Sequence, residues 1–216
     1  MSAHNSQLMG VVLRVDPRSP DAAVIREAAR MIRCGLIVAY PTDTLYGLAV
    51  DPRNLAAVRR LYEVKGRPES SALTLIAADI DQVRLAAHLT PAAEALARRW
   101  WPGPLTIVVR ADACIVPAAL AGGETVGVRV PDHPVAVDLA REVGFCITAT
   151  SANPSGGSPT PSADDVLAVL PGVEAIVDAG PAPGGAPSTI VSAVDRDVTL
   201  IRDGAVPWER VLRSLS

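Results

Sequence analysis

Residues 36–48 read LIVAYPTDTLYGL, and this stretch decides how the rest of the chain is interpreted. Its first four residues are apolar and the run then stops at Pro41, which predicts a short buried strand that delivers a polar loop to a pocket. The loop offers the hydroxyls of Thr42 and Thr44 and the carboxylate of Asp43. Because Pro, Thr and Asp are also common turn residues, an ordinary strand-to-turn transition is the alternative to a ligand-binding loop.

Length and composition indicate a folded protein with a sizeable core. The chain has 216 residues, of which 49% are hydrophobic and 20% charged. Because the composition never changes abruptly, we expect a flexible tail, residues 1–10, followed by a single domain, residues 11–216. The formal net charge of -3 argues against nucleic-acid binding through overall positive charge, so any affinity for polyanions must come from a local cluster.

Cysteine usage and hydropathy bear on the compartment. The cysteines Cys34, Cys114 and Cys146 are odd in number and far apart, which predicts neither a disulfide framework nor a zinc site. The first ten residues contain no apolar signal core, and the chain has no uninterrupted apolar run of about eighteen residues. We therefore expect a cytoplasmic protein that does not insert into membranes.

Helical and strand-like patterns alternate almost throughout, which predicts an α/β fold: an open, twisted, mixed sheet with helices packed on it. Capping signals place one helix from Pro20, capped by Ser19, to Gly35, and another starting at Asn54. Further helices are expected at 80–87, 91–101, 134–143, 162–170 and 207–212. Strands are expected at 36–39, 73–77, 105–109, 126–130, 146–149, 175–178, 189–192 and 199–202.

Fingerprints of several common enzyme classes are absent. The chain has neither the G-x-G-x-x-G motif nor the G-x-x-x-x-G-K-[ST] loop, which argues against a Rossmann dehydrogenase and a P-loop NTPase. A G-x-S-x-G nucleophile motif is also missing. The histidines His4, His88 and His133 do not fall at metal-ligand spacings, so we predict surface or helix-end positions for them and no protein-held metal.

Two cations, Lys65 and Arg67, stand at the end of the second predicted helix, just before Pro68. Cations at a helix C-terminus interact favourably with the helix dipole whatever they bind, and this is the structural alternative to a ligand role. The proline forces the preceding backbone to be extended, which projects the side chains beyond the helix. We expect both cations at an exposed helix end, where they could hold an anion.

Two further segments offer polar groups next to apolar runs. Arg129 ends such a run, where an ion-pair partner at a sheet edge is the commoner role and bidentate capture of a carboxylate the other. The segment from Ser151 to Asn153 precedes Pro154, a turn signal, but its small side chains also leave backbone N–H groups open to an anion. Together with the polar loop, these residues fit a phosphorylated ligand.

Seven ordered motifs show that the chain resembles the YrdC-like threonylcarbamoyl-AMP synthases over about residues 18–206. They are PTDTLYGL (41–48), KGRP (65–68), WPGPLT (101–106), VRVPDHP (128–134), SAN (151–153), STI (188–190) and RDG (202–204). The resemblance implies an open α/β sheet with a concave, locally basic groove. It also implies a nucleotidyltransferase that converts ATP, L-threonine and bicarbonate or CO2 into threonylcarbamoyl-AMP and pyrophosphate, for the modification of adenosine 37 in tRNA.

The resemblance also implies partners and roles for individual residues. Mg²⁺ would accompany ATP, RNA would bind weakly in the groove, and the product would pass to threonylcarbamoyl-transfer proteins. The implied contacts, by position in this sequence, are as follows: for threonine Thr42, Thr125, Arg129 and Ser188; for the nucleotide Lys65, Arg67, Ser151, Asn153 and Arg202, with Lys65 and Arg67 also catalytic.

The chain departs from the family pattern in three places. It has Ser71-Ala72-Leu73 where many relatives have Asn-Pro-Leu, and Ile76 where long forms carry a histidine, which bears on threonine selectivity. It ends soon after Arg202, so we expect the short, single-domain bacterial type. The alternatives are a protein of this fold that binds RNA or nucleotides without making the adenylate, and a carbamoyl-transfer module, which normally needs attached domains.

Overall fold

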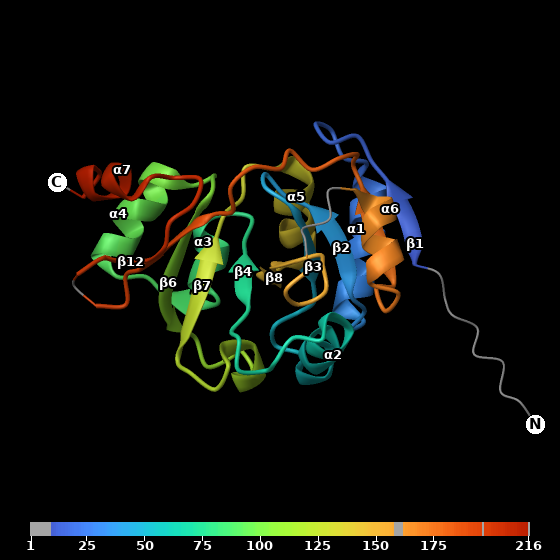
Figure 1. The fold of residues 1–216 in the computed structure, drawn as a ribbon, viewed down its shortest axis with the longest axis horizontal. Helices are drawn as coiled ribbons and strands as arrows, with labels where there is room; N and C mark the ends of the chain where they lie inside the picture. The colour runs from blue at the N-terminus through green and yellow to red at the C-terminus, as the bar shows by residue number, and fades with distance from the viewer. Residues whose placement is uncertain (1–9, 158–161, 196, 216) are drawn as a thin grey trace, which may run out of the picture.

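The computed structural model describes residues 10–157, 162–195 and 197–215, and it confirms the mixed α/β class (Figure 1). The predicted tail, residues 1–10, lies outside the described residues except for Gly10, and His4 lies outside them as well. In the part of the chain that is described, no helix has the length and apolar character needed to cross a membrane.

The strands form two sheets, so the prediction of one sheet was wrong. The five-stranded sheet has the order β1-β10-β2-β3-β9, the second sheet has the order β12-β11-β6-β7-β4-β8 with β5 paired to β6, and both contain parallel and antiparallel pairs. The strands are β1 (Val11–Arg14), β2 (Val38–Pro41), β3 (Tyr46–Ala49), β4 (Thr74–Ile76), β5 (Ala87–His88), β6 (Leu105–Ala111), β7 (Thr125–Arg129), β8 (Ile147–Thr148), β9 (Thr150–Ser151), β10 (Ala175–Asp178), β11 (Thr189–Ser192) and β12 (Thr199–Arg202).

Seven helices are described, and all but α1 begin within one residue of the predicted start. The helices are α1 (Ala22–Arg33), α2 (Leu55–Lys65), α3 (Ile80–Arg84), α4 (Pro91–Trp100), α5 (Pro134–Val143), α6 (Ala163–Val169) and α7 (Trp208–Arg213). The cap of α1 is Asp21 and not Ser19, because the Asp21 carboxylate accepts the backbone N–H groups of Ala23 and Val24. Helix α3 is shorter than predicted, since Ala87 and His88 pair as β5 with β6.

Strands β2 and β3 form an antiparallel hairpin in which Pro41 pairs with Tyr46. The strand predicted at 36–39 is therefore displaced toward the proline, which is tolerated at a strand end. The polar loop of the sequence is the turn of this hairpin, residues 42–45. The turn and the ligand-binding loop are thus not exclusive interpretations, because Thr42, Thr44 and Leu45 of this turn also line a pocket.

Thr148 of β8 joins the two sheets in the middle of the molecule. Its hydroxyl donates to the carbonyl of Leu48, in β3 of the first sheet, at 2.8 Å and accepts the N–H of Val50, just after β3, at 2.9 Å. Its carbonyl accepts the hydroxyl of the buried Tyr40 at 2.9 Å. The chain then passes from β8 to β9, and so from one sheet to the other, within a few residues. Figure 1 shows β8 between β4 and β3, with α4 and α7 at one end of the molecule and α1 and β1 toward the other.

Two groups of buried apolar side chains fill the space between helices and sheets. Helices α1 and α5 pack against each other and against β2 and β10, which accounts for the apolar face predicted for the first helix. The larger group joins α2, α4 and α6 to the second sheet and to β3. The junction of the sheets is consequently held from both sides, and polar side chains can gather there on a rigid base.

Candidate functional site

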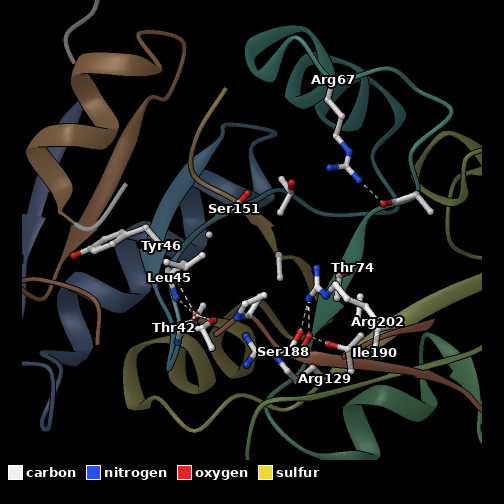
Figure 2. Close-up of a pocket in the computed structure, with 17 residues that line it drawn as sticks. Thr42, Leu45, Tyr46, Arg67, Thr74, Arg129, Ser151, Ser188, Ile190 and Arg202 are labelled. Atoms are coloured by element: carbon white, nitrogen blue, oxygen red, sulfur yellow. Dashed lines mark hydrogen bonds between the residues drawn. The ribbon is translucent and has the colours of Figure 1, made fainter. Parts of the chain in front are cut away.

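A pocket of about 340 Å³ lies where the two sheets meet (Figure 2). This volume falls within the usual size of a small-molecule site. Three arginines and seven Ser or Thr residues line the pocket, and among the described residues no carboxylate does. The lining residues are Thr42, Thr44, Leu45, Tyr46, Gly47, Arg67, Ala72, Thr74, Thr106, Arg129, Ala149, Thr150, Ser151, Pro187, Ser188, Ile190 and Arg202.

Thr42 fixes the turn between β2 and β3. Its buried hydroxyl donates to the carbonyl of Leu45 at 2.7 Å and accepts the N–H groups of Thr44 and Leu45, each at 3.2 Å. The hydroxyl of Thr44 lies 3.1 Å from it. The turn therefore carries its own hydrogen-bond network, which holds Asp43 in place between the two threonines.

Arg129, the last residue of β7, forms a buried ion pair with Asp43. Its Nη1 donates to Oδ1 of Asp43 at 2.7 Å, and the two side chains are only 7% and 12% exposed. Arg129 also lines the pocket, while Asp43 does not. The ion pair predicted for Arg129 is confirmed, and the same side chain also lines the pocket, where capture of a carboxylate stays a prediction.

Ser188 and Arg202 complete one side of the pocket with Arg129, and we call these three residues the arginine wall (Figure 2). Nη2 of Arg202 donates to the carbonyl of Ser188 at 2.6 Å and lies 3.3 Å from its hydroxyl. The Ser188 hydroxyl lies 2.9 Å from that of Thr106. Arg129 and Arg202 line the same pocket. Burial, and secondly the positive charge of Arg129, lowers the pKa of Arg202.

The opposite side is lined by Thr150 and Ser151. We call residues 150–153 the loop wall, of which residues 152 and 153 lie outside the lining, and Lys65 donates hydrogen bonds to its carbonyls. Lys65 was predicted at an exposed helix end, and this was wrong: it is 3% exposed. Its Nζ donates to the carbonyls of Ser151 and Asn153, the latter at 2.6 Å. Burial, and secondly the charge of Arg67, lowers the pKa of Lys65 to about 8. This residue is the only lysine in the sequence.

Arg67, two residues later, does reach the pocket. Gly66 ends α2 in the left-handed conformation with φ 58°, which turns the chain so that Arg67 leaves the helix. The guanidinium of Arg67 donates to the carbonyls of Ser71 at 3.3 Å and Ala72 at 3.0 Å. The departure from the family pattern at 71–72 thus falls on residues that Arg67 contacts through backbone carbonyls, whereas the side chain of Ile76 is buried in the core beside α5.

Asn153 closes the loop wall. Its Nδ2 donates to the carbonyls of Pro154 at 2.9 Å and Gly157 at 2.7 Å, which fixes the turn after β9. Its buried Oδ1 accepts no hydrogen bond from the described residues. A buried acceptor without a donor is costly in a native protein, so a ligand that donates a hydrogen bond here would satisfy it.

The structure brings together most of the nine residues predicted for the site. Those that line the pocket are Thr42, Arg67, Arg129, Ser151, Ser188 and Arg202. Lys65, which donates to the loop wall, and Asn153, which ends that wall, both lie outside the lining. Thr125 lies at the opposite end of β7 from Arg129, paired with Arg110. Thr74 and Thr106 also line the pocket and were not predicted, although a threonine within an otherwise apolar strand is a recognisable signal.

The described residues include no group of three or more His, Cys, Asp or Glu side chains that could hold a metal ion. The cations of the pocket are instead guanidinium groups, which bind carboxylates and phosphates through fixed, forked donors. With hydroxyl groups between them, they form a site suited to an anionic ligand that also carries hydrogen-bonding groups.

Comparison with known proteins agrees with this geometry. A family model named for Sua5, YciO and YrdC, with the description telomere recombination, matches residues 30–204. The chain belongs to this family. The threonylcarbamoyl-AMP synthase of Bacillus subtilis is 40% identical over 200 residues, 91% of this chain and 58% of the relative. That of Pyrococcus abyssi is 40% identical over 190 residues, 87% of this chain and 56% of the relative.

The Sua5 protein of P. abyssi has also been solved in complex with L-threonine. That structure matches with a TM-score of 0.89 and 35% identity over 94% of this chain and 60% of the other. Escherichia coli YciO matches with a TM-score of 0.82 at 23% identity, over 91% of this chain and 97% of the other, which supports the fold alone. The chain therefore spans rather more than half the length of the two synthases named above.

Proposed function

We propose that this protein is an L-threonylcarbamoyladenylate synthase, a nucleotidyltransferase that uses ATP, L-threonine and bicarbonate or CO2. The observation that carries the proposal is the pocket itself: three guanidinium groups and several hydroxyls, with no lining carboxylate among the described residues, in a chain of this family. ATP and bicarbonate are anions and threonine carries a carboxylate, and a lining of guanidinium groups attracts all three anionic groups. Its 40% identity to proteins named threonylcarbamoyl-AMP synthase supports the same reaction.

The chemistry requires two anions to meet. The amine of threonine and bicarbonate form a carbamate with loss of water, and a carbamate oxygen attacks the α-phosphorus of ATP. The bond from that phosphorus to the bridging oxygen breaks, and pyrophosphate leaves with the electron pair. No protein nucleophile is needed, so the contribution of the protein is orientation and stabilisation of charge.

We assign one side of the pocket to threonine and the other to the nucleotide. Arg129 and Ser188 of the arginine wall would bind threonine, whereas Arg67 and Ser151 would bind the nucleotide, with Arg202 between them. Lys65 and Asn153 would keep the loop wall in position, and a ligand donor would meet the free Oδ1 of Asn153. Thr125 lies too far along β7 for direct contact, about 13 Å from Arg129 at the usual rise per residue of a strand.

Mg²⁺ would enter with the nucleotide. The described residues offer no cage of acidic ligands, which fits a cation held mainly by phosphate oxygens and water. Bound in this way, it would neutralise charge that develops on the departing pyrophosphate. We further propose that the protein acts in the cytoplasm and that transfer proteins use its product to modify tRNA. We expect only weak RNA binding at the pocket, because the net charge of the chain is negative.

The reaction is tested by measuring pyrophosphate release from ATP with threonine, bicarbonate or Mg²⁺ omitted in turn. We expect release to need all three, and to be slower with serine, because a pocket that binds the extra methyl of threonine gains about 1 kcal/mol. Equal release without any amino acid would contradict the synthase assignment.

A second candidate is a binding protein of the same fold, and the three pocket guanidinium groups favour it, since they would bind phosphates with or without turnover. Such a protein would bind RNA with a steep dependence on salt and release no pyrophosphate. Titration of a fluorescent tRNA at several salt concentrations, beside the turnover assay, separates the two functions.

A further inference from the structure

Asp43 and Arg129 form an ion pair whose geometry leaves one edge of the guanidinium available. Asp43 takes Nη1, while Nε and Nη2 of Arg129 make no hydrogen bond to any of the described residues. Nε and Nη2 carry the two parallel N–H groups with which arginine binds a carboxylate through two bonds. Arg129 lines the pocket, so the unused edge belongs to the part of the side chain nearest the ligand.

The ion pair also sets the charge of the arginine wall. Arg129 and Arg202 carry two positive charges in this wall, and Asp43, which stands behind it, is the one carboxylate paired with either of them among the described residues. With Asp43 the wall and its support carry a net charge of about +1, and without it about +2. A site with one net positive charge suits a monoanionic carboxylate better than a polyphosphate.

We propose that Asp43 is a positioning and specificity residue: it turns the Nε and Nη2 edge of Arg129 toward the carboxylate of the amino-acid substrate and keeps other anions from occupying that place. This inference rests on the proposed function, because it assigns the amino acid to the arginine wall. Asp43 itself lies outside the pocket lining, so it acts through Arg129.

The test uses Asp43→Asn, which keeps a carbonyl oxygen for Nη1 but removes the charge, and Asp43→Glu, which keeps the charge. We expect Asp43→Asn to raise the KM for threonine about tenfold or more, because a charge-assisted contact is weakened, while the KM for ATP changes little. Inorganic sulfate should become a stronger competitor of threonine in this variant. Asp43→Glu should recover part of the threonine affinity. A general loss of structure would not produce this pattern.

The matched control is Asp51→Asn. Asp51 is 14% exposed and pairs with Arg53 at 2.7 Å, so it resembles Asp43 in burial and bonding but lies outside the pocket lining. We expect its threonine KM and its response to sulfate to equal those of the wild type. Thermal unfolding of all variants shows whether each is folded, and Asp43→Glu keeps the test available if Asp43→Asn is not.

A double-mutant cycle decides whether Asp43 acts through Arg129. In the Arg129→Lys background, Asp43→Asn should add little to the threonine defect, because the forked edge is already lost. Additive effects, or an unchanged threonine KM in a folded Asp43→Asn protein, would overturn the proposal. Calorimetry measures threonine binding without ATP in the same variants. A wild type that binds threonine but releases no pyrophosphate would contradict the proposed function. The role of Asp43 would then be decided by the threonine affinities of the variants alone.

Discussion

The loop wall and the arginine wall hold their positive charges in different ways. At the loop wall, the ammonium of Lys65 is surrounded by backbone carbonyls, those of Ser151 and Asn153. At the arginine wall, Arg129 is held by a carboxylate through a single nitrogen. A cation that binds backbone carbonyls fixes the conformation of that backbone segment. A guanidinium that binds one carboxylate oxygen still has N–H groups available for a ligand. We therefore expect substitutions at the first wall to change stability and those at the second to change substrate affinity.

Lys65→Met should give the largest effect and is the strongest test of this contrast. It leaves the two carbonyls without their donor, at about 1 to 3 kcal/mol for each buried group, so the free energy of unfolding should fall by about 2 to 6 kcal/mol. At about 2 to 4 °C for each kcal/mol in a chain of this length, the melting temperature should fall by about 4 to 24 °C. Circular dichroism melting curves measure this change.

Arg67→Ala is the comparison for Lys65→Met, because the two residues end the same helix. Its guanidinium is half-buried and bonds to two carbonyls of an exposed segment, so the melting temperature should change little. Pyrophosphate release should fall about ten- to a hundredfold if a charge-assisted contact of about 1.5 to 3 kcal/mol to phosphate is lost. Equal melting temperatures for the two variants would contradict a structural role confined to Lys65.

Arg129→Lys tests the arginine wall by keeping the charge and removing the fork. We expect the apparent affinity for threonine to fall about tenfold or somewhat more, since lysine cannot offer two parallel donors to a carboxylate. The affinity for ATP should change much less. Threonine titrations at saturating ATP and bicarbonate measure both effects, and indistinguishable affinities would reduce Arg129 to an ion-pair residue at the end of a strand.

The pH dependence of turnover should come from the loop wall. Because the pKa of Lys65 is lowered to about 8, the ammonium is present below that pH and is lost above it. One pH unit above this pKa, about a tenth of the groups remain charged, so the rate should fall about tenfold by pH 9. In Lys65→Arg, if it folds, the alkaline fall should move to higher pH.

Unfolding cannot explain such a fall. The pKa of this lysine is about 8 in the folded chain and 10.5 in its ordinary state, so between these values the unfolded chain binds more protons. The contribution of Lys65 to the free energy of unfolding therefore rises with pH across this window. Constant or rising melting temperatures between pH 8 and 9, beside a falling rate, would support loss of the charge itself.

Thr42→Val should have the smallest effect and tests the turn that carries Asp43. The buried hydroxyl of Thr42 serves three backbone groups of residues 44 and 45, so its removal should cost about 1 to 2 kcal/mol of unfolding free energy. Thr42→Ser keeps the hydroxyl and is the matched control. Denaturant titrations of both variants measure the difference, which should be accompanied by a weaker threonine affinity in Thr42→Val only.

Local signals in the sequence predicted most elements of the fold. Helix α5 and strands β10, β11 and β12 have the predicted bounds, because proline, glycine and alternating apolar residues mark their ends. The division into two sheets was not predicted, since strand pairing depends on contacts between segments far apart in the sequence. Strand β3 was missed because all four of its residues are buried, which leaves no alternation to detect.

The burial of Lys65 could have been predicted from the spacing of apolar residues in α2. Val58, Leu61 and Tyr62 form the buried face of α2, and Lys65 follows Val58 by seven residues, which places it on the same face of the helix. The helix dipole favours a cation at the C-terminal end of a helix whether or not that cation faces solvent. What the sequence could not provide is the acceptor, because the carbonyls of Ser151 and Asn153 are almost ninety residues away.

Because Lys65 is the only lysine of the sequence, it gives the chain a single side-chain amine for acylating reagents. In the native structure Lys65 is 3% exposed and its amine is hydrogen-bonded to the loop wall. The rate at which Lys65 is acylated, measured by mass spectrometry, would therefore report how often this wall opens to solvent. Comparing the acylation rates of Lys65 with and without substrates would show whether the substrates suppress this opening.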